Sequence, residues 1–149
     1  KVRLFVLNQI LWSLYNVFDI CIFVGPPGHT YRLEHLLEII RAVTGWNTTW
    51  VELLDIGRRA LSMARCFNMR EGFSVVDDWL PERFFEPLQG GNSAGNAVSK
   101  DELRKAIQMY YSLMGWDPNS GVPTEATLHY LGLSWVLDDK DFRKLITRR

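Results

Sequence analysis

The sequence has few cysteines and no excess of charge of either sign. Its 149 residues carry 17 basic and 17 acidic side chains, so the formal net charge is zero. A chain without net charge offers no global field to attract nucleic acid or an anionic membrane, and we expect neither as a partner. The two cysteines, Cys21 and Cys66, both stand in apolar stretches. Such spacing does not indicate a disulfide scaffold and favours a reducing, cytoplasmic setting.

A signal peptide and an uninterrupted membrane span are also missing. The chain begins at Lys1 with no initiator methionine, basic leader or small-residue cleavage site, so we expect a piece of a longer protein. Residues 4–24 are hydrophobic, but polar side chains interrupt them at Asn8, Gln9, Asn16 and Asp19. An aspartate at the centre of a membrane helix costs about 2.5 to 3.5 kcal/mol. We therefore expect a buried helix here.

Helical periodicity dominates the first half of the chain. The segment from Val2 to about Ile20 is apolar on nearly every side, as in a helix packed between neighbours. Residues 25–28, Gly-Pro-Pro-Gly, are expected to end it. Thr30 is placed to cap a second, amphipathic helix, and Gly45 is placed to stop it.

A third helix is predicted from the pair Thr49 and Glu52, which forms a capping box, to about Asn68. Gly57 lies inside this helix, where glycine costs about 1 kcal/mol relative to alanine. It indicates a close backbone approach, which an ordinary packing contact explains as well as a ligand does.

The helical period disappears after Met69, and residues 89–98 are expected to form a flexible, exposed loop. A second capping box, Ser99 with Glu102, then opens a helix that Gly115 closes. Its predicted inner face consists of Leu103, Ala106, Ile107, Tyr110 and Met114. A short helix from residues 123–124 to Gly132 and a last one capped by Asp138 or Asp139 complete the chain. The predicted fold is all-α, a single irregular multi-helix domain of residues 1–149 with long loops.

Charged and aromatic side chains crowd the segment that follows the third helix. The arginines are Arg65, Arg70 and Arg83, and the nearby acids are Glu71, Asp77 and Asp78. We expect partly buried bidentate pairs between them. Because the opposite charges are locally balanced, a structural clasp is favoured over a binding site.

Local catalytic and metal-binding patterns are weak. No glycine-rich phosphate fingerprint is present. The three histidines, His29, His35 and His129, lack the close pairing of metal ligands and are expected to be structural or exposed. By residue frequency alone, Cys21 would be a buried small hydrophobe.

Several linked motifs nevertheless resemble one known family. Residues 65–84 resemble the RxFNxREG and DDxLPxRF signature in the C-terminal domain of tungsten-containing aldehyde:ferredoxin oxidoreductases. The segments that continue the resemblance, in the family's order, are 44–46, 57–59, 110–117, 121–124 and 128–133. The resemblance covers about residues 12 to 136.

This resemblance implies a cofactor site near the start of the chain. The family's Asp-x-x-Gly-Leu-Cys motif, which contacts a pterin and ligates a 4Fe-4S cluster, falls on residues 16–21. It implies that Cys21 is the cluster ligand and that Asn16, Asp19 and Ile20 lie beside the cofactors. Asn16 stands where Asp is usual, which removes a charge and adds a donor. Asp19 stands where Gly is usual, and Ile20 replaces Leu conservatively.

The resemblance also implies the activity of the whole enzyme. A small aldehyde would be oxidised to a carboxylate at tungstopterin, with electrons passing through the 4Fe-4S cluster to ferredoxin. The other three cluster cysteines and the substrate-pocket acid and His would lie upstream, so no catalytic residue falls in this chain. Residues 1–25 would be the part nearest the cofactors and residues 30–147 the helical body. The isolated chain is expected to be inactive, to bind no cofactor alone and to partner the enzyme's remaining domains.

Two other interpretations stay open. The chain could be part of a tungsten-dependent acyl-CoA reductase, or a non-catalytic helical module that kept the scaffold and lost the cofactor. For an enzyme fragment, we expect the apolar first helix to leave an exposed hydrophobic patch in the isolated chain.

Overall fold

All regular elements are helices in the part of the chain that the computed structural model describes, residues 1–24 and 32–147. The α-helices are α1 (Val2–Val17), α2 (Leu33–Thr44), α3 (Trp50–Arg70), α4 (Lys100–Met114), α5 (Glu125–Tyr130) and α6 (Lys140–Thr147). Two 3₁₀ helices, η1 (Glu82–Phe85) and η2 (Ser134–Asp138), precede α4 and α6. The predicted all-α class is confirmed.

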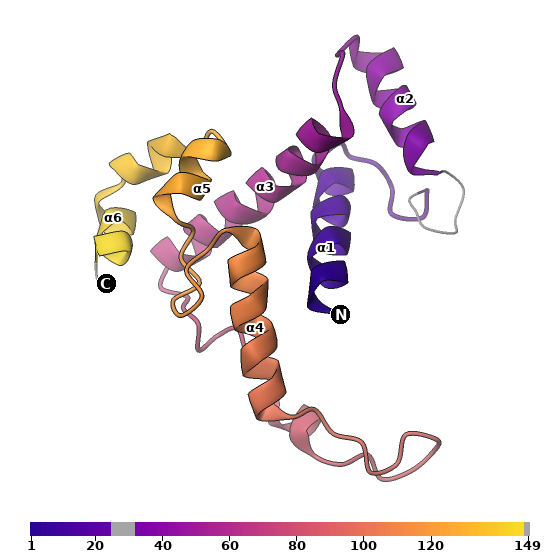
Figure 1. Ribbon diagram of the computed structural model, residues 1–149, viewed down its shortest axis with the longest axis vertical. Helices are drawn as coiled ribbons and strands as arrows, with labels where there is room; N and C mark the ends of the chain where they lie inside the picture. Colours follow the sequence, from indigo (N-terminus) through magenta and orange to yellow (C-terminus); the bar gives the residue numbers. More distant parts are fainter. Residues whose placement is uncertain (25–31, 148–149) are drawn as a thin grey trace.

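Helix α3 runs through the middle of the molecule and joins three hydrophobic clusters (Figure 1). Near its start, Leu53 packs with residues of α1 and α2. In its middle, Leu61 packs against a cluster shared by α1 and α4. Near its end, Cys66 and Met69 pack against α5, η2 and α6. The other elements are therefore held together mainly through α3.

Helix α1 crosses α3 at Gly57. A Cβ atom at this position would collide with the carbonyl oxygen of Ile10 and lie 3.2 Å from the Ile10 Cγ2 atom. Only glycine lets the two backbones approach so closely. The close approach expected at Gly57 is confirmed, and its partner is a helix backbone.

The predicted helix caps are largely present. Thr49 and Glu52 form both bonds of the capping box at the start of α3. At the start of α4 the Ser99 hydroxyl accepts from the Glu102 N–H, which is half of the predicted box. Asp139 caps α6 by accepting from the backbone N–H groups of residues 141 and 142. Side-chain caps therefore set several of the predicted helix starts.

The boundaries near the first turn differ from the predicted ones. Helix α1 ends at Val17, three residues before Ile20, because the chain turns at a left-handed residue. The predicted cap Thr30 and the expected stop at residues 25–28 lie outside the described residues. Within the described chain Arg32 occupies the N-cap position of α2, and Gly45 ends this helix with a φ of 73°.

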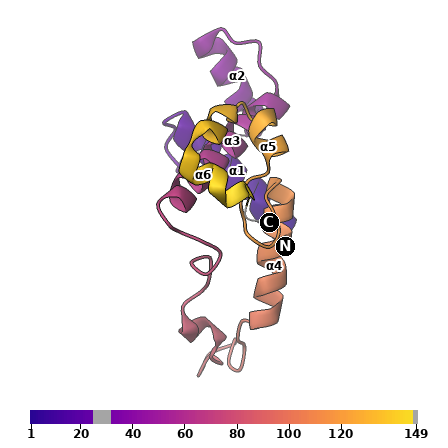
Figure 2. The same ribbon diagram turned by 90° about the vertical axis from the view of Figure 1, so that its left-hand side faces the viewer.

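Residues 82–98, in the connection between α3 and α4, form an arm that extends away from the three clusters (Figures 1 and 2). Backbone hydrogen bonds close the arm on itself, from Leu88 N–H to Asn96 O at 3.0 Å and from Val98 N–H to Phe84 O at 2.9 Å. Flexibility of residues 89–98 stays a prediction.

Helix α1 leaves apolar side chains exposed, as the sequence predicts. Its exposed apolar side chains are Leu4, Phe5, Leu7 and Val17, and Ile22 and Phe23 are exposed beyond the helix. None of the helices within residues 1–24 and 32–147 is long and apolar enough to cross a membrane.

Candidate cofactor-binding site at the end of α1

Helix α1 ends in a hydrogen-bonded turn that fixes the four predicted site residues. The Asp19 N–H donates to the Asn16 carbonyl at 3.2 Å, and the Ile20 N–H donates to the Tyr15 carbonyl at 3.0 Å. These two bonds make a Schellman motif, in which the residue after the C-cap adopts the left-handed conformation. Here that residue is Asp19.

Asp19 has a φ of 53°, and no other non-glycine residue in the described ranges has a positive φ. Glycine adopts this conformation without steric cost, whereas Asp is one of the few other residues that tolerate it. The backbone therefore explains why glycine is usual at this place in the Asp-x-x-Gly-Leu-Cys motif. It also shows that the substitution leaves the turn intact.

Ile20 anchors the turn to the core, and Cys21 emerges from it. The Ile20 side chain packs against the cluster that contains Leu14 and Leu53. Cys21 is exposed and forms no disulfide. The two following side chains, Ile22 and Phe23, are 54% and 79% exposed. The expectation from residue frequency, a buried thiol at Cys21, is therefore wrong.

Three polar side chains gather at this end of α1 without partners. The side chains of Asn16, Asp19 and Cys21 are exposed, and none is hydrogen-bonded to another residue in ranges 1–24 and 32–147. Their chemistry suits the implied cofactors, because a thiolate ligates iron, and an amide and a carboxylate bind the polar edge of a heterocycle. No group of three His, Cys, Asp or Glu side chains able to hold a metal occurs in the described chain.

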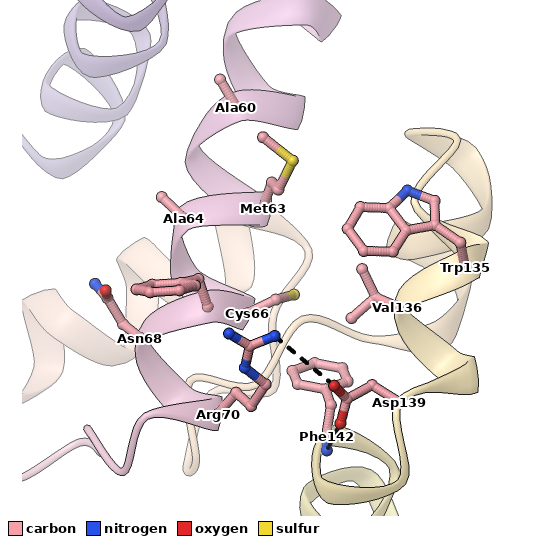
Figure 3. Close-up of a pocket in the computed structure, with 11 residues that line it drawn as sticks. Ala60, Met63, Ala64, Cys66, Asn68, Arg70, Trp135, Val136, Asp139 and Phe142 are labelled. Atoms are coloured by element: carbon pink, nitrogen blue, oxygen red, sulfur yellow. Dashed lines mark hydrogen bonds and ion pairs between the residues drawn. The ribbon is translucent and has the colours of Figure 1, made fainter.

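The second cysteine lies in a pocket of about 430 Å³ between α3 and the C-terminal elements η2 and α6 (Figure 3). Cys66 is 4% exposed, and burial raises the pKa of its thiol to about 12. A thiol with such a pKa stays protonated at neutral pH and is a poor metal ligand. Apolar side chains such as Met63, Trp135 and Phe142 form the walls.

The charged groups at this pocket are already paired. Arg70 contacts the Glu71 carboxylate at 2.9 Å and the Asp139 carboxylate at 3.9 Å. Figure 3 shows Arg70 and Asp139 facing each other beside Phe142. The pocket therefore offers mostly apolar walls and compensated charges.

Arg65 forms the clasp predicted from the crowded charged segment. Its guanidinium makes a bidentate pair with Asp78, with N–O distances of 3.0 and 2.7 Å. Its Nε donates to the Gly121 carbonyl at 3.1 Å, and its Cζ lies 5.6 Å from the centre of the Trp116 ring. Arg65 is only 9% exposed and is paired with these groups, which favours the structural role over a binding role.

Tyr111 completes the clasp. The predicted inner face of α4 included its neighbour Tyr110 and did not include Tyr111. The Tyr111 hydroxyl donates to Asp78 and accepts from Arg65 at 3.4 Å. Burial, with the hydrogen bond to Asp78, raises the pKa of Tyr111. Helical periodicity alone could place either Tyr110 or Tyr111 on the inner face of α4. The one sequence feature that indicated Tyr111 was its position in the family motif at residues 110–117.

The histidines and the other predicted pairs stay outside any site. His35 and His129 are exposed, and His129 contacts the Ser134 hydroxyl at 2.8 Å. His29 lies outside the described residues. Asp77 caps the turn at Ser74 by accepting from its backbone N–H at 2.7 Å. Arg83 lies over the Phe84 ring and forms no ion pair within the described chain.

Comparisons with known proteins point to the same family as the motifs. The family model described as aldehyde ferredoxin oxidoreductase, domains 2 and 3, matches residues 1–133. A tungsten-containing aldehyde ferredoxin oxidoreductase of Pyrococcus furiosus is 32% identical over 138 residues, which are 90% of this chain and 21% of that protein. The WOR-like subunit of an aliphatic sulfonate oxidoreductase from the same organism is 31% identical over 85% of this chain and 20% of its own length.

A solved structure shows the same fold. It is the active site complex BamBC of benzoyl coenzyme A reductase with 1,5-dienoyl-CoA, and the match has a TM-score of 0.80 at 21% identity. The match covers 99% of this chain and 21% of that chain. The chain thus spans about one fifth of the length of each of these proteins.

Proposed function

The chain belongs to the aldehyde ferredoxin oxidoreductase family, and from this premise we propose that it is the C-terminal part of a tungsten-pterin, iron-sulfur oxidoreductase. The proposed whole enzyme oxidises an aldehyde to a carboxylate and passes the electrons to ferredoxin. The exposed Cys21, placed directly after the left-handed turn of the family motif, is the observation that carries this proposal.

In the proposed enzyme, Cys21 supplies one of the four thiolates of a 4Fe-4S cluster. Such clusters are held by four cysteine thiolates, so three must come from the rest of the enzyme. The Schellman turn ends at the anchored Ile20, directly before Cys21, and the Cys21 carbonyl accepts a hydrogen bond from the Val24 N–H. A ligand with a fixed backbone loses little freedom when it binds iron, which favours cluster assembly.

The same turn presents Asn16 and Asp19 to the proposed pterin. When bound, tungstopterin supplies the oxidation chemistry, and this chain orients the cofactor by hydrogen bonds. Asn16 offers one carbonyl oxygen and one amide donor group, and Asp19 offers two acceptor oxygens.

The exposed apolar side chains of α1 and of the turn that follows it are the proposed contact with the rest of the enzyme. They are Leu4, Phe5, Leu7, Val17, Ile22 and Phe23. Covering these side chains removes apolar area from water, at about 25 cal/mol for each Å². The remaining domains would thereby exclude water from the cofactors that Cys21 and its neighbours contact.

Metal analysis of the full-length protein tests the proposal. We expect four iron atoms for each chain and a stoichiometric amount of tungsten in protein purified without oxygen. Reconstitution of the isolated 149-residue chain with iron and sulfide should give no stable cluster, because one thiolate cannot hold four irons. A full-length protein without iron and tungsten would instead support a non-catalytic module.

Activity assays separate the substrate classes within the family. We expect the full-length enzyme to reduce ferredoxin with small aldehydes as electron donors. Aliphatic sulfonates, assayed as electron donors, and aromatic acyl-CoA thioesters, assayed as electron acceptors with reduced ferredoxin, cover the substrate classes of the other related proteins. Activity confined to one of these two classes would contradict the aldehyde assignment and leave the cofactor assignment intact. A reducing cytoplasm is part of the proposal, because it keeps Cys21 available to iron.

A further inference from the structure

Helix α3 carries one arginine that its own fold does not pair. The other arginines of this helix, Arg59, Arg65 and Arg70, each donate a hydrogen bond to a carbonyl or carboxylate oxygen. Arg58 makes no hydrogen bond or ion pair with the described part of the chain, and its Nε atom is buried without an acceptor. A partly buried charge without a counter-charge, and a buried donor without an acceptor, both oppose folding.

The place of Arg58 on the helix would suit an apolar residue. Leu54 precedes it by four residues and Leu61 follows it by three, so the three side chains form one row. Both leucines pack against the cluster shared by α1 and α4. A residue that breaks such a pattern without compensation in its own fold points to a functional role.

The nearest acid in sequence is already engaged. Asp55, one turn before Arg58, accepts a hydrogen bond from the Tyr130 hydroxyl at 2.5 Å. This bond raises the pKa of Tyr130, and the nearby charge of Arg58 opposes the rise. Arg58 therefore lies beside the pair of Asp55 and Tyr130 and is not neutralised by it.

The neighbouring side chains form an exposed surface with an excess of positive charge. Val51 is 67% exposed, one turn before Asp55, and Tyr130 is 66% exposed. We call Val51, Asp55, Arg58 and Tyr130 the Arg58 surface. The adjacent Arg59 bonds a neutral carbonyl, so two arginines here face one acid. Tyrosine and arginine are enriched at the centres of protein interfaces, and this charge balance calls for an acidic partner.

We propose that the Arg58 surface docks against another domain of the same polypeptide, and that an Asp or Glu carboxylate of that domain pairs with the Arg58 guanidinium. The inference rests on the proposed function for the presence of further domains, and this chain spans about one fifth of the length of its relatives. The two terminal nitrogens of Arg58 are not enclosed as Nε is, and together they can bind a carboxylate through two parallel hydrogen bonds. A permanent partner is favoured over a transient one, because the charge would be unpaired whenever a transient partner left.

Carbodiimide coupling in the full-length protein tests the pairing. Arg58→Lys keeps the charge and supplies an amine, which the activated carboxylate acylates to form an amide while the reagent leaves as a urea. We expect mass spectra of the digested single-chain band to show a link from position 58 to an Asp or Glu outside residues 1–149. Wild type should give no link there, because a guanidinium is not coupled. The ion pair of Lys100 and Glu82 is the internal positive control.

The alternative outcomes of the coupling are distinct. No link at position 58, or a link only to Asp55, would overturn the inference. A link to a second copy or to added ferredoxin would also overturn it, because the proposed partner belongs to the same polypeptide. Each of these results leaves the proposed function in place, since that function depends on iron and tungsten. A full-length protein without these metals would overturn the proposed function, while a link to another domain would still support the pairing.

Melting temperatures give a second readout with opposite signs. In the isolated chain, Arg58→Met should raise the melting temperature by about 2 to 4 °C, because methionine continues the apolar row and removes an unpaired charge. In the full-length protein it should lower the melting temperature by at least about 2 °C, because the partner carboxylate loses its counter-charge. Arg59→Met is the matched control: its bond to Gly132 lies within the chain, so both proteins should shift in the same direction. Shifts of the same sign for Arg58→Met in the two proteins would overturn the inference.

Discussion

The two cysteines of this chain lie in opposite environments, although both stand in apolar sequence. Cys66 is on the inner side of α3, 4% exposed, in contact with side chains of the C-terminal elements. Cys21 lies beyond the end of α1, exposed and beside exposed Phe23. The first thiol has the neighbours of a core residue, and the second has the neighbours of a surface that another part of an enzyme covers.

The contrast shows that apolar neighbours in sequence do not decide burial. Cys66 and Met69 are three residues apart on one helix, so both face the same cluster. Cys21 has no helical face, because the left-handed Asp19 turns the chain before it. Cys66 therefore has a structural role, and Cys21 is the proposed ligand.

Thiol labelling should give the largest difference between the two regions. At pH 8 Cys21 should react with a disulfide reagent like an unhindered thiol, whereas Cys66 should react only when the chain opens. Since global opening costs about 5 to 15 kcal/mol, we expect a rate ratio of at least about a thousand. The variants Cys21→Ser and Cys66→Ser assign the two phases. Equal rates in the folded chain would remove the distinction between the two sites.

Substitution of Gly57 should weaken the packing of α1, which leads to Cys21, against α3, which carries Cys66. This glycine lies where the helix that leads to Cys21 crosses the helix that carries Cys66. The added methyl group of Gly57→Ala meets the Ile10 carbonyl, so we expect the free energy of unfolding in urea to fall by about 1 to 3 kcal/mol. Gly90→Ala is the matched control, because its Cβ meets nothing within 4 Å. It should change stability by less than about 0.5 kcal/mol. Equal stability of the two variants would refute the tight crossing.

Alkaline pH should destabilise the Cys66 region. The pKa of Cys66 rises from 9.0 to about 12 on burial, so the folded state holds the thiol proton more tightly than the unfolded state. Its contribution to stability is therefore complete below pH 9 and is lost as pH rises toward 12. The slope is at most about 1.4 kcal/mol per pH unit. Tyr110, whose pKa rises from 10.0 to about 12, adds a loss that begins one unit higher.

Urea titrations at pH 8, 9 and 10 isolate the cysteine contribution. Cys66→Ala should show a smaller loss of stability between pH 9 and 10 than wild type, and Cys21→Ser should behave like wild type. An unchanged slope in Cys66→Ala would contradict the burial argument.

The exposed apolar side chains of α1, the helix that leads to Cys21, should give the smallest effect. The isolated chain is expected to self-associate through the exposed side of α1, so light scattering should show a mass that rises with concentration. Phe5→Ser should reduce this rise, and Val43→Ser, which changes an exposed residue on α2, should not. A strict monomer at high concentration would show that these exposed apolar side chains do not drive self-association.

Local rules predicted much of the fold. The capping residues Thr49 and Asp139 and the stop at Gly45 act within a few residues of the helix ends that they define, so sequence alone reveals them. The close contact at Gly57 was likewise predictable, because glycine inside a helix needs a reason. Local charge balance predicted that Arg65 pairs with an acidic side chain, but it did not predict that this side chain is Asp78.

Other features depend on contacts distant in sequence. The pocket at Cys66 requires Trp135 and Phe142, which are about 70 residues away and follow no shared period. The early end of α1 was missed because the left-handed residue is Asp19 and not glycine. The site residues themselves were predicted from family resemblance. The exposure of their side chains could not be predicted from sequence, because it depends on how α1 and α3 cross.

Iron content of the full-length protein with each cysteine replaced tests the central claim most directly. We expect wild type and Cys66→Ala each to hold a 4Fe-4S cluster, with four irons per chain, and Cys21→Ala to lose this cluster. An intact four-iron cluster in Cys21→Ala, or its loss only in Cys66→Ala, would contradict the assignment of Cys21 as the ligand.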